Sequence, residues 1–522
     1  MGRLRHLLIG AGLVGSVFLT AGIDYFEEQL PSTMNPLYTR TMVDRRSHEL
    51  VFDRLFYRSA ITNELRSRLV DRFQILEGGK KIKITLKPGV KWHDGKALGP
   101  ADVCFTIDAM LNTKNPSNES KDYRDSLAGC EALPKENAAV VAFKKIYHNP
   151  RERIAFHVLP KHKFDSTTIS QEDDFALRPV GTGPMKASKG RREVSFTAVP
   201  NAHHQPNIDR AQLKEGGDPF VQVRTLINGG VQGVVSVAPP LRPEVAASDD
   251  VALKSYDLRS WWFIAVNTSN GALKKKEVRQ ALNLSLDRAE LRELTIGVDK
   301  DDPNPPCEFI SGPFVQSSPY YNRQIRVTER SDRAKAASLM QAAGATKAAG
   351  RWTVDGAPVN LRLGMNAPLN GEARDLLNQV GNQLQAGGFD RQVYRVTADD
   401  WNRKVVSGQM KEFDLLIGKW SFGLVEYVNP LFHSRTGGKG AMNIFNYSNP
   451  KVDNILARFD AARTDTEARD AYHDLHSTVA DDLPYLFLWK LDTKSAWRNE
   501  IRNNIIAPYY YFTEFDGWTQ ER

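Results

Sequence analysis

The amino-acid sequence predicts an α/β protein folded as more than one lobe. Its 522 residues are too many for one hydrophobic core, so two or three folding units are expected. Strand-like and helix-like segments alternate irregularly along the chain, without an internal repeat or a low-complexity linker. With 41% hydrophobic and 25% charged residues, and no second long apolar run after the N-terminus, the body of the chain has a globular composition.

The N-terminal segment RHLLIGAGLVGSVFLTA contains the pattern G-x-G-x-x-G at Gly10, Gly12 and Gly15. A dinucleotide-binding loop also needs a second strand that ends in an acidic residue, and the following GIDYFEEQLPSTMN has no run of Val, Ile or Leu to form one. A basic start followed by an apolar run is instead typical of a secretory signal peptide. We therefore expect residues 1–23 to be a signal peptide or an uncleaved N-terminal membrane anchor.

Hydrophobic periodicity predicts regular elements in order along the chain. Residues 82–86 alternate as a strand, and the next helix begins at Pro100 with Asp102 in its first turn. Apolar residues three and four apart predict the later helices. The helices expected in this way cover residues 275–291, 333–343, 375–387 and 452–461, and a further strand covers 138–145.

The net charge of +8 is spread along the chain, with basic residues interleaved with acidic ones. The longest basic cluster, Lys274 to Lys276, precedes a predicted helix and is typical of a solvated loop. No nucleic-acid partner is therefore expected.

Three cysteines are present. Cys104 and Cys130 lie on either side of a loop, and a disulfide between them is plausible in an oxidising compartment. Two separately buried thiols are the alternative. Cys307 remains a lone thiol, and there is no CxxC motif.

Several short motifs, in their order along the chain, resemble one known family. ITLKPGVKWHDGKALGPADVCFTIDAML is similar to the signature of the peptide/nickel family of solute-binding proteins that serve ABC importers. The similarity continues through HVLPKH, RPVGTGPMKA, FIAVNTSN, EVRQALNLSLDR, SGPFVQSSPYYN, AASLMQAAGA, WTVDGAPVNLRL, FDLLIGKW and LPYLFLWKLDTKSAW. Together these blocks cover most of the chain.

The resemblance implies a periplasmic-binding-protein type II clam-shell, with two lobes and an extra α/β domain. Lobe I would combine residues 24–56, 171–262 and 487–522, the extra domain would be 57–170, and lobe II would be 263–486. Two crossing strands would form a hinge. A ligand that touches both lobes would shift the population toward the closed form, which a membrane permease recognises.

The resemblance also implies ligand-binding residues in lobe II. Trp420 falls where the family has a lid tryptophan, and Trp401 resembles another pocket aromatic, with core packing as the alternative for both. Peptide binders of the family carry an Asp three residues after the lid tryptophan, where this chain has Gly423. Glu426 could replace that Asp as the partner of a ligand ammonium, or it could be a solvated loop acid.

Further candidates lie in the expected crossover strand. Strand alternation sends Trp261 and Phe263 to one face and Trp262 to the other, and one of them should face the cleft. Asn267 would cap this segment near the hinge, with a local turn amide as the alternative.

Two other segments resemble parts of the family's cleft. The loop Gly181-Thr182-Gly183 resembles a cleft loop whose glycines allow close backbone approach. Met42 aligns with a strand position at the edge of the ligand.

Histidine pairs raise the question of a metal site. His203 and His204 are adjacent, and His473 and His476 lie about one helical turn apart. Neither pair has a third ligand of the expected type nearby in sequence, so surface histidines and no metal are expected. No catalytic residue or cofactor is expected either, because no Ser elbow, metal triad or paired carboxylates emerge.

These observations favour the extracytoplasmic solute-binding component of an ABC importer, which captures a peptide or similar small polar solute as a periplasmic monomer. The missing Asp at Gly423 points away from peptides with a free amine, toward blocked peptides, sugars, opines or siderophore-like solutes. The alternative is a membrane-tethered sensor or interaction protein built on the same scaffold. An exported hydrolase is the weakest hypothesis.

Overall fold

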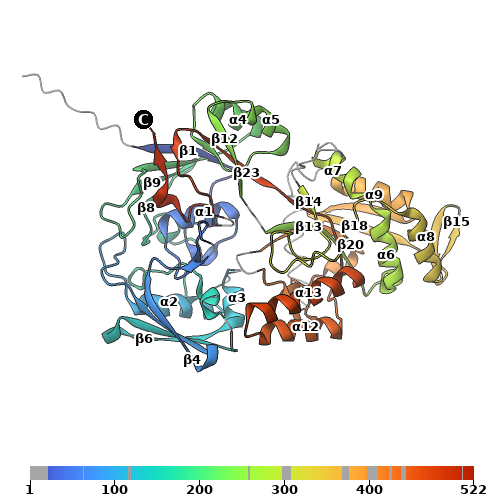
Figure 1. Ribbon diagram of the computed structural model, residues 1–522, viewed down its shortest axis with the longest axis horizontal. Coiled ribbons are helices and arrows are strands. Elements are labelled where there is room, and N and C mark those ends of the chain that lie inside the picture. Colours follow the sequence, from blue (N-terminus) through green and yellow to red (C-terminus); the bar gives the residue numbers. More distant parts are fainter. Residues whose placement is uncertain are drawn as a thin grey trace, which may run out of the picture.

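The computed structural model describes residues 21–521, apart from 63, 116, 118, 148, 257–258, 297–306, 367–374, 397–403, 405–408, 423–425, 437–441 and 508–509. Figure 1 shows two bodies of mixed helices and strands, joined by crossing segments near the middle of the view. The N-terminal half of the chain, with its C-terminal segment, forms one body, and residues from about 260 to 490 form the other.

Lobe I is built on a seven-stranded mixed sheet with the order β12-β23-β11-β1-β10-β9-β8. The central strand β1 runs parallel to both of its neighbours, β10 and β11. The strands come from three separate parts of the chain: β1 (Gly22–Glu27), β8 (Met185–Lys189), β9 (Glu193–Ala198), β10 (Arg210–Glu215), β11 (Gly233–Val234), β12 (Val251–Tyr256) and β23 (Thr493–Arg498).

The position of β1 corrects the reading of the segment GIDYFE. The segment forms a strand although it has no run of Val, Ile or Leu, because Ile23 and Tyr25 alternate as fully buried residues. Aromatic residues favour strands as strongly as branched aliphatic ones do. The boundary expected at residue 23 therefore cuts through β1. The rest of the expected signal peptide or anchor, residues 1–20, lies outside the described residues, and none of the described helices is long and apolar enough to cross a membrane.

The extra domain is a four-stranded antiparallel sheet with the order β4-β5-β7-β6. Its first helix begins at Pro100, as the sequence predicts, and Asp102 accepts a hydrogen bond from the Gly99 N–H at 2.9 Å. One buried hydrophobic cluster runs from Tyr25 in lobe I to Ile82 in this domain, so the two share a single core. The elements are β4 (Val70–Leu76), β5 (Lys81–Leu86), β6 (Leu127–Leu133), β7 (Ala138–Phe143), α2 (Pro100–Leu111) and α3 (Glu119–Ser126).

Lobe II is built on a five-stranded sheet with the order β19-β18-β20-β13-β21, and helices bury both of its faces. The predicted alternation is confirmed, because Trp261 and Phe263 pack in one core cluster and Trp262 packs in the other. The helix expected over 275–291 is instead two helices, separated at Leu286, whose backbone is extended. The elements are β13 (Ser260–Val266), β18 (Asn360–Asn366), β19 (Asp390–Val396), β20 (Leu415–Ser421), β21 (Tyr485–Phe487), α6 (Lys276–Ser285), α7 (Arg288–Ile296), α8 (Arg333–Ala342), α9 (Leu376–Ala386), α11 (Asn429–Phe432), α12 (Pro450–Ala461) and α13 (Asp465–Asp482).

Smaller elements complete the fold. They are α1 (Met42–Val51), α4 (Pro219–Ile227), α5 (Arg242–Ala246), β2 (Tyr57–Arg58), β3 (Leu65–Arg66), β14 (Cys307–Phe309), β15 (Thr346–Ala348), β16 (Arg351–Val354), β17 (Ala357–Pro358), β22 (Trp489–Leu491), β24 (Ile501–Arg502) and β25 (Thr519–Gln520).

The chain passes between the two sheets from β12 to β13 and again from β22 to β23. The whole of β13 belongs to the sheet of lobe II, and so does β21. The lobe boundaries expected at 262–263 and 486–487 therefore fall inside β13 and β21, whereas the chain leaves one sheet at the end of β12 or β22 and enters the other at the start of β13 or β23.

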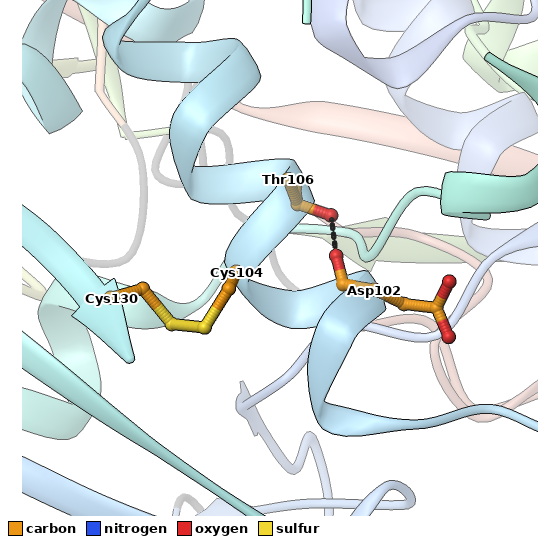
Figure 2. Close-up of a disulfide and its surroundings, with 4 residues drawn as sticks. All are labelled: Asp102, Cys104, Thr106 and Cys130. Atoms are coloured by element: carbon orange, nitrogen blue, oxygen red, sulfur yellow. Dashed lines mark hydrogen bonds between the residues drawn. A yellow bond between two sulfur atoms is a disulfide. The ribbon is translucent and has the colours of Figure 1, made fainter. Parts of the chain in front are cut away.

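A disulfide joins Cys104 on α2 to Cys130 on β6, with 5.1 Å between their Cα atoms (Figure 2). On the same helix, Thr106 Oγ1 donates a hydrogen bond to the Asp102 carbonyl and accepts one from the Leu159 N–H. Cys307 is a buried free thiol, and burial raises its pKa to about 12. The disulfide therefore ties the helix of the extra domain to an edge strand of its sheet.

The double variant Cys104→Ala/Cys130→Ala is expected to unfold more easily by about 3 kcal/mol, because the cross-link closes a 26-residue separation in the unfolded chain. Urea unfolding with and without a reductant measures this loss. Reductant should destabilise the natural protein and the Cys307→Ala control, and leave the double variant unchanged. Equal sensitivity of all three proteins to reductant would contradict the disulfide.

Candidate ligand-binding site

A cavity of about 830 Å³ lies between the two bodies, beside the first crossing. One wall comes from Arg58 on β2 and Glu152 in the extra domain, whose side chains form an ion pair at 2.7 Å. The opposite wall comes from the loop 316–324 and from the first turns of α13, both in lobe II. Arg259, just before β13, completes the lining. Such a volume suits a small solute or a short peptide.

The lining of this cavity carries more positive than negative charge. Its arginines are Arg58, Arg259, Arg323 and Arg469, and its acids are Glu152 and Asp465. Glu152 already forms an ion pair with Arg58. The acids of the lining are therefore too few to compensate all of its arginines. None of these residues was predicted from the sequence, because they are scattered singly over more than 400 positions.

Glu426 is not a solvated loop acid, and its role as the counter-ion of a ligand ammonium stays a prediction. Its side chain is completely buried behind the cavity wall. The Ser318 hydroxyl donates to Glu426 Oε2, and Arg259 Nη1 lies 3.5 Å from the same oxygen. A buried carboxylate needs such partners, and here a cation of the protein supplies the compensating charge.

The two tryptophans of the paired strands β13 and β20 lie opposite each other in register. Trp261 is fully buried and stacks on Phe422, while half-buried Trp420 stacks on Phe263 with 5.6 Å between ring centroids. Trp262 and Phe263 are also buried, so none of the three residues 261–263 presents an exposed face to the cleft. Neither Trp261 nor Trp420 is in the cavity lining. A ligand role for Trp420 stays a prediction.

Other predicted residues serve the fold or cannot be placed. Trp401 and Gly423 lie outside the described residues. Asn267 is buried after β13, where its amide donates to the Phe413 carbonyl and its oxygen accepts from Ser269. Asn267 therefore acts as the local turn amide that was the alternative reading.

The loop Gly181-Thr182-Gly183 does allow a close backbone approach, but to the protein itself. A Cβ on Gly181 would lie 1.8 Å from the Val51 carbonyl oxygen at the end of α1, and Gly183 donates to that oxygen at 2.9 Å. His93 of the extra domain binds the loop from the other side, with Nδ1 accepting from the Gly181 N–H and Nε2 facing the Gly183 carbonyl. Burial lowers the pKa of His93 to about 4, so this clamp is a neutral imidazole.

The alignment with the family implied that Met42 lies on a strand, but it does not. It is the first residue of α1, which follows a capping box in which Thr41 Oγ1 accepts from the Asp44 N–H and the Asp44 carboxylate accepts from the Thr41 N–H. This pairing of Thr and Asp three residues apart is a helix-start signal in the sequence.

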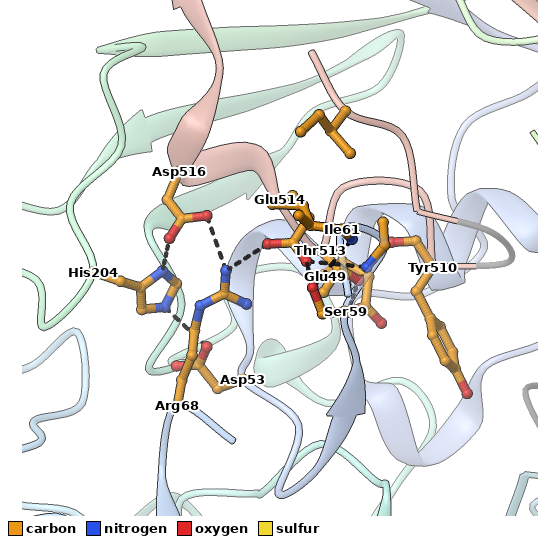
Figure 3. A network of polar contacts seen from close by, with 12 residues as sticks. Glu49, Asp53, Ser59, Ile61, Arg68, His204, Tyr510, Thr513, Glu514 and Asp516 are labelled. Carbon is orange, nitrogen blue, oxygen red and sulfur yellow. Dashed lines mark hydrogen bonds and ion pairs between the residues drawn. The ribbon is translucent and has the colours of Figure 1, made fainter. Parts of the chain in front are cut away.

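The expectation of surface histidines holds for exposed His203, while His204 and His473 are half-buried and His476 is buried. His476 is completely buried, where burial lowers its pKa to about 4 and it contacts the Ser311 hydroxyl at 3.0 Å. His203 and His204 meet the buried carboxylate of Asp53, which lies 150 positions earlier in the chain. Figure 3 shows His204 between Asp53 and Asp516, with Arg68 beside them.

Beyond the cavity, the extra domain touches lobe II directly. Lys145 Nζ lies 2.5 Å from Asp460 Oδ2 on α12, and the Arg153 guanidinium lies over the Tyr427 ring at 4.9 Å. In Figure 1, α12 and α13 lie beside the extra domain. The two bodies therefore contact each other on this side of the cavity.

Comparison with known proteins identifies the family. Residues 64–440 match the model of the bacterial extracellular solute-binding proteins, family 5. The chain belongs to this family. Among curated family 5 relatives, the oligopeptide-binding protein AppA of Bacillus subtilis is 24% identical over 94% of this chain and 89% of its own length. The glutathione-binding protein GsiB of Pectobacterium atrosepticum is 24% identical over 86% of this chain and 85% of its own.

Solved structures support the family 5 fold. The structure of Bacillus subtilis AppA in complex with a nonapeptide superposes with a TM-score of 0.81 and 21% identity, covering 96% of this chain and all of that one. The two-lobed α/β architecture expected from the sequence is confirmed by this likeness. Family 5 proteins are substrate-binding transport proteins.

In this family 5 protein, Glu426→Ala is expected to destabilise the fold by about 1–3 kcal/mol, because Ser318 and Arg259 lose a buried acceptor. Urea unfolding measures the change. Glu426→Gln keeps an oxygen for Ser318 and should lose less than the alanine variant. If the two variants unfold like the natural protein, the buried pairing described here is wrong.

Proposed function

We propose that this protein is the extracytoplasmic solute-binding component of an ABC importer, which captures a peptide or similar small polar solute and delivers it to a membrane permease. The observation that carries the proposal is the cavity between the two bodies, lined from both of them, on a chain of this family. The curated relatives named above are an oligopeptide-binding and a glutathione-binding protein. The protein works as a monomer in the periplasm, with its N-terminal segment either removed or kept as a membrane tether.

Capture works through closure of the lobes. A solute in the cavity touches Arg58 on one body and the loop 316–324 on the other, so it makes its full set of contacts only when the bodies are closed. A ligand shifts an equilibrium only by its differential affinity for the two states. Contacts divided between the two walls supply that difference, and the permease then receives the closed form.

The charge of the cavity favours a solute with an acidic group. The arginines outnumber the acids of the lining, and Glu426 behind the wall is compensated by Arg259. A free ammonium would enter an environment where four arginines face two acids, one of them already paired, which is costly in a partly buried site. Carboxylates, in contrast, can bind arginine in bidentate fashion. Peptides blocked at the N-terminus and other small anionic solutes fit best.

The test is thermal unfolding with a matched set of short peptides. N-acetylated acidic peptides are expected to raise the melting temperature more than the same peptides with a free amine and an amidated C-terminus, because a ligand that binds only the folded state stabilises it. Arg469→Gln, which changes the cavity lining, should reduce the shift. Arg351→Gln, at an exposed ion pair with Asp390, should keep it. Absence of any shift with peptides or other small polar solutes would refute solute capture.

Charge reversal at the contact between the extra domain and α12 should open the unliganded protein. In Lys145→Glu, two carboxylates face each other where Lys145 now meets Asp460, and the closed form loses population. Small-angle X-ray scattering should record a larger radius of gyration, and ligand affinity should fall. Lys83→Glu breaks a similar pair with Glu136 inside the extra domain and should change neither quantity. Identical scattering by the two variants would show that the Lys145 contact does not hold the lobes.

A further inference from the structure

We propose that Asp53, His203 and His204 form a binding site for one divalent transition-metal ion of the zinc type, separate from the solute cavity. One ligand atom from each residue lies within 4.8 Å of the others. None of the three residues is in the cavity lining. Metal binding at this site can therefore be tested independently of the proposed solute.

The three side chains come from two segments of lobe I that are distant in sequence and adjacent in the folded chain. Asp53 follows the end of α1, and the two histidines lie in the connection between β9 and β10. His203 Nε2 is 3.1 Å from one oxygen of the Asp53 carboxylate, and His204 Nε2 is 2.9 Å from the other. Ligand atoms around a tetrahedral zinc ion, about 2.0–2.1 Å from the metal, are separated by only slightly more than this. A small outward movement of the rings would admit the ion.

His204 directs Nε2 toward the Asp53 carboxylate, with 2.9 Å between Nε2 and Oδ1. Both of its ring nitrogens are shielded from solvent, yet neither makes an aligned hydrogen bond within the described part of the chain. The Asp53 carboxylate is held in place from behind, because the Thr182 hydroxyl donates to it at 2.9 Å and it is nearly completely buried. A fixed carboxylate with two converging imidazoles is a donor set typical of Zn²⁺ sites.

A second carboxylate supports the first set of ligands. Asp516 Oδ2 lies 3.6 Å from His204 Nδ1, on the ring edge opposite Asp53, and Arg68 binds Asp516 at 2.9 Å (Figure 3). Histidines that bind metals commonly turn their other nitrogen to a carboxylate, which orients the ring and raises its basicity. Asp516 is thus a positioning residue for His204.

The side chains around the site carry more negative than positive charge, which favours a divalent cation. Asp53, Asp516 and Glu514 are three carboxylates, and Arg68 is the cation that faces Asp516 and Glu514. Although burial opposes protonation of His204, Asp53 and Asp516 outweigh it and raise the pKa to about 8. The site therefore attracts positive charge, which a metal ion can supply.

A bound ion would link three distant segments of the chain. Asp53 follows α1, the histidines lie between β9 and β10, and Asp516 belongs to the C-terminal segment that also holds Arg68 of the extra domain. Such an ion stabilises the folded state in proportion to how tightly it binds. It would also fix the Thr182 loop, which bonds to Asp53 and packs against α1.

The full chain, freed of metal and held in chelator-free buffer, is titrated with ZnCl₂ by calorimetry, and with CoCl₂ as a spectroscopic probe. One equivalent of Zn²⁺ should bind, the Co²⁺ form should show visible absorption of a four-coordinate site, and Zn²⁺ should raise the melting temperature. The double variant His203→Ala/His204→Ala should lose the bound equivalent and the Zn²⁺-dependent shift. Asp516→Asn should weaken binding about 10- to 100-fold while keeping the stoichiometry.

His162→Ala is the matched control, because His162 also faces a carboxylate, Asp94 at 2.7 Å, but has no second imidazole beside it. It should bind Zn²⁺ as the natural protein does. Melting of each variant in metal-free buffer shows whether it folds, and a folded double variant makes the comparison valid. If the double variant does not fold, the reduced Zn²⁺ affinity of Asp516→Asn carries the test. Binding of no equivalent by the natural protein, or undiminished binding by the double variant, would overturn the proposal.

Discussion

The way the chain crosses between its two sheets is the constraint on which the rest of this structure depends. Each crossing enters an interior strand: β12 leads into β13, which lies between β20 and β21 in lobe II, and β22 leads into β23, which lies between β12 and β11 in lobe I. A strand hydrogen-bonded on both sides cannot twist or slide alone without losing its ladder bonds. Movement at either crossing is therefore passed to a whole sheet, and closure is a motion of two rigid bodies.

The extra domain does not add a third independent body. Its buried residues belong to the same hydrophobic cluster as those of lobe I, and the neutral His93 clamps the Gly181-Thr182-Gly183 loop to it. Separating the two would expose a shared core, which costs far more than breaking the few polar contacts with lobe II. The contact of Lys145 with Asp460 therefore reports on closure of the lobes, although neither residue lies in the cavity.

Sequence patterns predicted the features of the fold that depend on neighbouring residues, such as strand faces and helix starts. Strand alternation placed Trp261 and Trp262 on opposite faces correctly, and Pro100 marked a helix start. The failures are of two kinds. β1 was missed because its buried face uses Tyr25, and Met42 was misplaced because an alignment outweighed the Thr41 capping signal beside it. These two errors could have been avoided.

Long-range pairings could not be predicted in the same way. The partner of His203 and His204 is Asp53, some 150 positions away, and Glu426 meets Arg259 across a similar distance. No periodicity carries such information, because the contacts exist only after two sheets have formed and packed. Without knowledge of these contacts, the sequence around Glu426 indicates only a loop acid, and the sequence around His203 and His204 indicates only surface histidines.

The pairing of Glu426 with Arg259 links the choice of ligand to the hinge. Arg259 lies at the start of β13, on the first crossing, and it lines the cavity while facing Glu426 behind the wall. A ligand ammonium that reached Glu426 would have to displace this arginine and leave a second cation uncompensated. A ligand carboxylate meets Arg259 without breaking the pair, because a guanidinium has donors on more than one edge. The same ion pair therefore ties the first residue before β13 to the wall of the cavity that an anionic solute would meet.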